Sequence, residues 1–166
     1  MTSIETRLAS LERRLREAED RLALLHIVAS YGPAVDSGSA EATAAIWTED
    51  GCYDSDPAVF EGRRQIAEMV LGPRHQGLIG SGAAHLIGIP HIALDGDKAV
   101  VTTYSQLVLR DQDGPGFRVA RTGVNRWEFV RTGEGWKVRD RVNRQLGGGA
   151  PARALAASAV NPAPES

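Results

Sequence analysis

Two side chains in this sequence have the chemistry of a general base and its partner. His85 opens an apolar, strand-like segment, Ala84-His85-Leu86-Ile87-Gly88, and Asp36 ends a helical stretch upstream. An imidazole with a pKa near ~6.5 can take up and return a proton near neutral pH without a metal or cofactor. A carboxylate beside it would fix its tautomer and stabilise the imidazolium. The sequence therefore predicts that His85 is a base oriented by Asp36, provided that the fold brings the two together.

Other polar candidates lie on one predicted strand and near its neighbours. With a period of two, Arg121, Asn125 and Trp127 share a face, and we expect this more apolar face to line a pocket and contact the substrate. A guanidinium in an apolar wall would hold a carboxylate, phenolate or enolate, unless Arg121 pairs with an acidic residue at the rim. The hydroxyls of Tyr31 and Tyr53 could polarise a carbonyl, or both could be ordinary core tyrosines.

The sequence favours chemistry without a metal or cofactor. His75, His85 and His91 are widely spaced, and a glycine-rich segment separates the first from the others, so we expect no metal site and no cofactor. The single cysteine, Cys52, has no partner for an internal disulfide. It could be a nucleophile, but a small core residue is the commoner role.

The composition is typical of one globular domain with a small organic ligand. The 166 residues, 42% hydrophobic and 24% charged, suffice for one sizeable core. The formal net charge of −2, with both signs interspersed, gives no basic face for phosphates, so we expect no nucleic acid partner. No apolar run approaches the ~20 residues of a membrane helix, and the N-terminus lacks a signal-peptide core. We therefore expect a cytoplasmic protein with no membrane partner.

A heptad repeat occupies residues 4–25. Apolar residues recur at alternating spacings of four and three, at Ile4, Leu8, Leu11, Leu15, Ala18, Leu22 and Leu25. With leucine at position a, the e positions hold Glu5, Glu12 and Glu19, and the g positions hold Arg7, Arg14 and Arg21. Because g faces e in a parallel pair, the pattern predicts a homo-oligomer, dimer or trimer, with parallel N-terminal helices. The alternative is an amphipathic helix packed on its own domain.

The expected elements form an α+β fold. Helices are expected up to residue 36 and over 40–47 and 65–71, and strands over 52–54, 85–94, 98–110, 119–131 and 136–145. Helices followed by a strand meander predict a curved antiparallel sheet wrapped around three N-terminal helices, with its interior as the ligand site. We divide the chain into a heptad helix (1–24) continuous with the domain, the domain itself (25–146), and a flexible tail (147–166) that could dock as a short lid.

Several segments resemble scytalone dehydratase, in the SnoaL-like branch of the NTF2-like superfamily. They cover roughly residues 20–146 and include Val35-Asp36-Ser37, the strand around Tyr53, His85-Leu86-Ile87-Gly88, Tyr104-Ser105-Gln106-Leu107 and Trp136-Lys137-Val138. The resemblance implies a cone-shaped α+β barrel. As in several members, the lindane dehydrochlorinases among them, it also implies an Asp-His dyad that removes a proton without a cofactor. On that basis Asp36 and His85 carry over as the dyad, and Tyr53 as a contact to a substrate hydroxyl.

Two departures from scytalone dehydratase imply a different substrate. Val35 stands where those enzymes have a tyrosine, and Arg121 stands where they have a second active-site histidine. The hypothesis is a cofactor-independent lyase or isomerase, dehydratase-like, for a small hydrophobic cyclic or polyketide-like compound. Tyr31, Tyr53, Arg121 and Asn125 would stabilise its developing negative charge. The alternatives are a non-catalytic module that binds a hydrophobic ligand and a protein whose N-terminal helix serves assembly, since the superfamily is not uniform in function.

Overall fold

The chain forms helices and strands throughout residues 3–160, the part that the computed structural model describes. The helices are α1 (Ile4–Asp36), α2 (Ala40–Ala45), α3 (Gly62–Leu71), α4 (Pro73–Gly80) and α5 (Ala150–Ala157). The strands are β1 (Trp47–Asp54), β2 (Val59–Glu61), β3 (Ala83–Ile87), β4 (His91–Asp95), β5 (Lys98–Arg110), β6 (Phe117–Thr132) and β7 (Gly135–Gln145). Residues 1, 2 and 161–166, parts of the predicted heptad helix and tail, lie outside the described residues.

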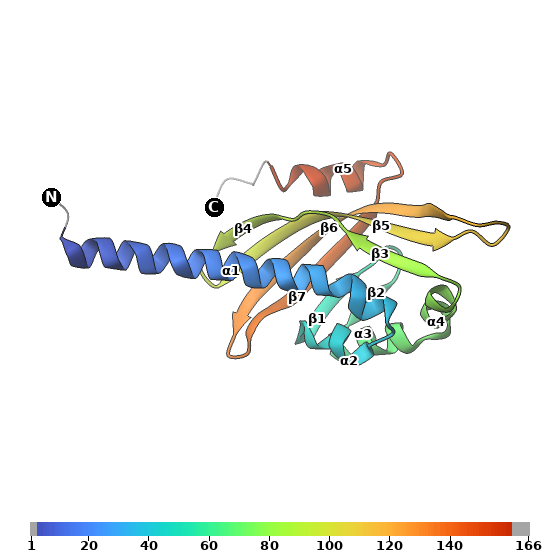
Figure 1. Cartoon of the computed structure of the whole chain (residues 1–166), viewed down its shortest axis with the longest axis horizontal. Coiled ribbons are helices and arrows are strands. Elements are labelled where there is room, and N and C mark those ends of the chain that lie inside the picture. Colours follow the sequence, from blue (N-terminus) through green and yellow to red (C-terminus); the bar gives the residue numbers. More distant parts are fainter. Residues whose placement is uncertain (1–2, 161–166) are drawn as a thin grey trace.

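The strands form one curved sheet in the order β2-β1-β7-β6-β5-β3, with β4 also paired to β5. All pairings are antiparallel except that of β1 with β7, which is parallel. The prediction of a wholly antiparallel sheet is therefore wrong at this pairing, because β1 lies beside the last strand of the meander. Helices α1 to α4 lie on one side of the sheet and α5 on the other (Figure 1). The α+β class predicted from the sequence is confirmed.

Some predicted elements have different bounds for local reasons. The helix expected over residues 40–47 ends at Ala45, because Trp47 begins β1 and is fully buried against the sheet core. The strand expected over 85–94 is broken into β3 and β4 around Pro90, which has no N–H to give to a ladder. The glycine-rich stretch after α3 contains a helix, α4, which starts with proline at its first turn.

One apolar core fills the concave side of the sheet. Leu24, Val28, Tyr31 and Val35 follow one face of α1 at spacings of four and three, and all four are buried. They pack against aromatic side chains of the sheet, Trp47, Trp127 and Phe129. Burying each such side chain contributes roughly 1.5–3 kcal/mol. This packing fixes the C-terminal half of α1, and with it Asp36, relative to the strands.

The C-terminal helix lies away from the concave side. Helix α5 packs on β6 and β7, with Ala152 buried, on the opposite face from α1 (Figure 1). The described part of the predicted tail is therefore a docked helix and not a lid over the concave side. Within residues 3–160, no helix is both long enough and apolar enough to cross a membrane.

Candidate active site

The structure brings together Asp36 and His85, the two residues that the sequence paired. Asp36 is the last residue of α1, and His85 lies at the centre of β3. The His85 Nδ1 lies 2.6 Å from Asp36 Oδ1, and the His85 backbone N–H donates to Asp36 Oδ2 over 2.8 Å. Because a carboxylate can only accept, Nδ1 carries the proton and Nε2 keeps the lone pair. Asp36 Oδ1 thus fixes the tautomer of the His85 ring, and Asp36 Oδ2 holds the His85 backbone.

A glycine allows α1 to approach β3 closely enough for this contact. A Cβ added at Gly32 would lie 2.4 Å from the His85 carbonyl oxygen, closer than such atoms ever come. Both surfaces at this point are backbone, so neither can give way without moving its element. Gly32 therefore sets the distance between the helix end and the strand.

Substituting Gly32→Ala is expected to separate α1 from β3. The overpacking should lower the free energy of unfolding by about 1–3 kcal/mol and pull His85 away from Asp36. Urea unfolding gives the stability. The matched control is Gly77→Ala on α4, where an added Cβ meets nothing within 4 Å. We expect this control to be neutral or slightly stabilising, and equal stability of the two variants would contradict the close-approach argument.

Burial keeps His85 in its neutral, basic form. Desolvation lowers the pKa of His85 below its ordinary value, while the hydrogen bond to Asp36 and the negative charge of Asp36 oppose that shift. The neighbouring His75 and Arg141 lower the His85 pKa further. At neutral pH the imidazole therefore has a free lone pair on Nε2, and Asp36 stabilises the imidazolium once a proton is taken.

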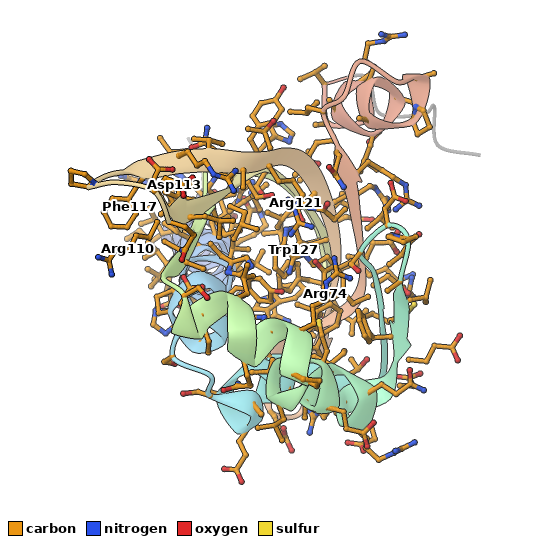
Figure 2. The ribbon with its side chains drawn as sticks, turned by 90° about the vertical axis from the view of Figure 1, so that its right-hand side faces the viewer. Arg74, Arg110, Asp113, Phe117, Arg121 and Trp127 are labelled. Carbon is orange, nitrogen blue, oxygen red and sulfur yellow. The ribbon has the colours of Figure 1, made fainter. Side chains whose placement is uncertain are left out.

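The His85 ring lies in the wall of a cavity of about 410 Å³ between the sheet and α1, α3 and α4. This volume is within the range of small-molecule sites. Three other predicted site residues, Tyr31, Tyr53 and Arg121, also line it. In Figure 2, Arg121 lies under the arch of the sheet, and Arg74, from α4, lies below it on the helix side.

Two predicted substrate contacts do not reach this cavity. Trp127 is fully buried and packs among the core aromatic rings, against Tyr31, Trp47 and Phe129. Asn125 is also fully buried. Both residues lie on the inward face of β6, as the period of two predicted, but behind the wall. Their prediction as substrate contacts is therefore corrected to a supporting position.

Asn125 instead organises the polar part of the wall. Its side-chain oxygen accepts hydrogen bonds from Arg141 Nη2 (2.8 Å), Arg141 Nε (3.1 Å) and Asn143 Nδ2 (2.8 Å). Its Nδ2 donates to the Ser105 hydroxyl over 2.8 Å. Arg141, Asn143 and Ser105 all line the cavity. Asn125 therefore fixes three cavity groups at once.

Arg141 is the main residue that the sequence reasoning missed. It lies on β7, lines the cavity and is 3% exposed, and its Nη1 has no hydrogen-bond partner among the described residues. None of the ion pairs among the described residues includes Arg141. A buried guanidinium without an anion is costly. Such a group is a ready site for negative charge on a ligand.

Aromatic rings compensate part of the Arg141 charge. The guanidinium carbon lies 3.9 Å from the ring centre of Trp127, 4.1 Å from that of Tyr31 and 4.5 Å from that of Tyr53. Ring faces attract cations, and the attraction grows when water is excluded. Burial raises the pKa of Tyr31 above its ordinary value, so its hydroxyl stays neutral and able to donate. The aromatic residues thus hold Arg141 in place without neutralising it.

A second histidine lies beside the first. His75, from α4, lines the cavity; its Nε2 donates to the Val35 carbonyl over 2.8 Å, and its ring stacks on that of His85 at 5.8 Å between ring centres.

Among residues 3–160, no group of three or more histidine, cysteine or carboxylate side chains is arranged to hold a metal ion. Cys52 lies outside the cavity wall, and burial raises the pKa of its thiol, which disfavours the nucleophilic thiolate.

A family model for the SnoaL-like domain matches residues 16–142 of the chain. The chain belongs to the SnoaL-like family. This family has the NTF2-like fold and includes isomerases and dehydratases. Membership confirms the branch that the sequence resemblance indicated.

Solved structures agree with this assignment. An NTF2-like protein with a cystatin-like fold from Novosphingobium aromaticivorans is 39% identical, with a TM-score of 0.86 over 89% of this chain and 96% of that one. A protein of unknown function from Mycobacterium tuberculosis is 20% identical (TM-score 0.68, 90% of each chain). A candidate scytalone dehydratase from N. aromaticivorans is 18% identical (TM-score 0.64, 82% of this chain and 88% of that one). The last two share the fold alone. No functionally curated protein matches the chain significantly.

Proposed function

We propose that this protein is a cofactor-independent lyase or isomerase that begins its reaction by removing a proton from carbon with His85 and Asp36. The observation that carries the proposal is the 2.6 Å contact between His85 Nδ1 and Asp36 Oδ1 in the wall of an open cavity. This contact leaves Nε2 as the proton acceptor and gives the resulting imidazolium a carboxylate partner.

The electron pair released by proton removal needs a stabilising group. When the broken C–H bond lies beside a carbonyl, the pair moves onto the carbonyl oxygen and forms an enolate. Arg141, with an unpaired Nη1 and no counter-ion, is suited to that oxygen, and the neutral Tyr31 hydroxyl can add a hydrogen bond. Expulsion of a leaving group from the next carbon gives the lyase outcome, and return of the proton at another carbon gives the isomerase outcome.

The cavity suits a small cyclic compound with one or two oxygen substituents. Its volume of about 410 Å³ exceeds that of a fused two-ring molecule, and Met69, Leu78, Ile87 and Phe60 supply apolar wall. Its cationic groups come from the sheet, Arg121 and Arg141, and from α4, Arg74. A largely hydrophobic ring bearing a carbonyl or phenolic oxygen meets both requirements.

A direct experiment uses 2-tetralone, a bicyclic ketone with acidic protons beside its carbonyl. In D₂O the protein should accelerate exchange of these protons, observed as loss of their proton NMR signal, whatever the natural leaving group. The non-catalytic binding alternative predicts saturable binding of 2-tetralone with exchange at the buffer rate. Exchange no faster than in a sample of Asp36→Asn protein would count against the proposal.

A further inference from the structure

The N-terminal half of α1 extends beyond the domain, and its apolar residues face water. Among residues 3–19 none is buried, whereas from Leu24 onward the helix packs into the core. Figure 1 shows this half, in dark blue, projecting past the end of the sheet. The large apolar residues of the heptad repeat, which we term the seam, are 42% to 82% exposed; they are Ile4, Leu8, Leu11, Leu15, Leu22 and Leu25.

The seam points away from its own domain. Asp20 binds the domain by accepting hydrogen bonds from Arg131 Nη2 (2.6 Å) and Trp136 Nε1 (3.0 Å), and the buried Leu24 lies one turn further on the same side. At ~100° per residue, Leu22 lies roughly 160° around the helix from Asp20, and Leu11 is on the opposite side. The chain's own domain therefore does not cover the seam.

An exposed apolar stripe of this length indicates an interface. From Ile4 to Leu25 it spans roughly 33 Å at ~1.5 Å per residue. A projecting helix without tertiary contacts is marginally stable in water, and contiguous apolar surface on a monomer is uncommon. The stripe has the a and d spacing that two helices share in a coiled coil.

We propose that the seam packs against the seam of a second copy of this chain in a parallel, in-register coiled coil. The sorted charges identify the occupant. In that arrangement Arg7 faces Glu12 of the partner subunit, and Arg14 faces Glu19 of the partner subunit, in both directions across the pair. An antiparallel pair would oppose arginine to arginine and glutamate to glutamate. A helix face that only met solvent would need no such sorting.

The rest of the fold accommodates this assembly. Because Asp20 and Leu24 hold the domain on the side opposite the seam, the domains of two copies project outward from the shared helices and keep their own contacts. The cavity is lined by α4, β3 and the adjoining strands, which lie at the other end of the molecule from the N-terminus (Figure 1). Association through the seam therefore leaves both cavities open.

Sedimentation equilibrium of the full chain tests the proposal. The wild type should have an apparent mass at least twice the 17.8 kDa of one chain. A Leu8→Asp/Leu15→Asp variant should have a lower apparent mass, because its chains dissociate. The control Arg13→Ala changes the face of α1 opposite the seam and should leave the apparent mass unchanged. A monomeric wild type, or a wild-type mass retained by the leucine double variant, would overturn the proposal.

Charge variants and cross-linking test the orientation. Glu12→Arg/Glu19→Arg and Arg7→Glu/Arg14→Glu should each weaken self-association, and mixing the two variants should restore it. A Leu11→Cys substitution in a Cys52→Ala background should form a disulfide between copies on mild oxidation, because equivalent d positions adjoin only in a parallel pair. Failure of that disulfide in an otherwise associated sample would overturn the parallel arrangement.

Discussion

His85→Ala is expected to lower the rate of 2-tetralone exchange by about 10²–10⁴, the usual contribution of a positioned general base. The substitution removes the lone pair on Nε2 and leaves no other group in its place on β3. The fold should persist, because His85 lies in the cavity wall and is only partly buried. Exchange in D₂O measures the rate, and circular dichroism verifies the fold.

The Asp36→Asn variant separates the role of the carboxylate from that of the imidazole. Asparagine can accept a hydrogen bond from one donor of His85 but presents an amide to the other, so the tautomer is no longer fixed and the imidazolium loses its counter-charge. We expect the rate of 2-tetralone exchange to fall by about 10²-fold or more. His91→Ala, on β4 and outside the cavity wall, is the matched control. Wild-type exchange in either dyad variant would remove the proposed mechanism.

Arg141→Met is expected to lower exchange by about 10²–10³ while the protein stays folded. Loss of one preorganised donor to an oxyanion has an effect of this size. Removal of a buried charge without a counter-ion relieves its desolvation cost, which offsets the loss of the hydrogen bonds to Asn125 and of the contact with the Trp127 ring. Urea unfolding and the exchange assay together distinguish this pattern from simple misfolding.

A binding measurement isolates the charge of Arg141 from catalysis. The wild type should favour bound 2-naphthol in its ionised form, so the pKa of the bound phenol, followed by absorbance, should be lower than in water. Arg141→Met should remove that decrease, whereas Arg121→Met, at a partly exposed position, should reduce it less. An unchanged pKa of the bound phenol in Arg141→Met would show that Arg141 does not serve the oxyanion.

The dyad was predictable because the sequence pattern and the family resemblance both marked its two residues. Asp36 ends a long periodic helix, as predicted, and His85 lies in the predicted apolar strand, which begins two residues earlier than expected and so has His85 at its centre. The inward face of β6 was also predictable from the period of two. The alternation of side chains along a strand gives the face on which a residue lies, but it does not tell whether that residue reaches a cavity. Asn125 and Trp127 are therefore on the predicted face but lie behind the cavity wall.

Arg141 could not have been found by alternation. On β7, Trp136 and Val138 are buried, and strict alternation would then turn residue 141 outward. The pairing with β6 shifts at this point, with Val138 opposite Phe129 but Asp140 opposite Glu128, so the strand gains an extra residue. This β-bulge exchanges the two faces of the strand for the residues that follow it, and it turns Arg141 into the cavity.

His75 was missed because the glycines around α4 suggested a loop, although proline at the first turn of α4 is a usable helix signal.

The pH dependence of exchange tests the central claim most directly, that neutral His85 is the base. Burial holds the pKa of His85 below ~6.5, and only the neutral form accepts a proton. The rate should therefore be constant through neutral pH and fall in acid with a single titration below ~6.5, and this titration should be absent in His85→Ala. A rate that does not fall in acid, or the same titration in His85→Ala, would contradict the account.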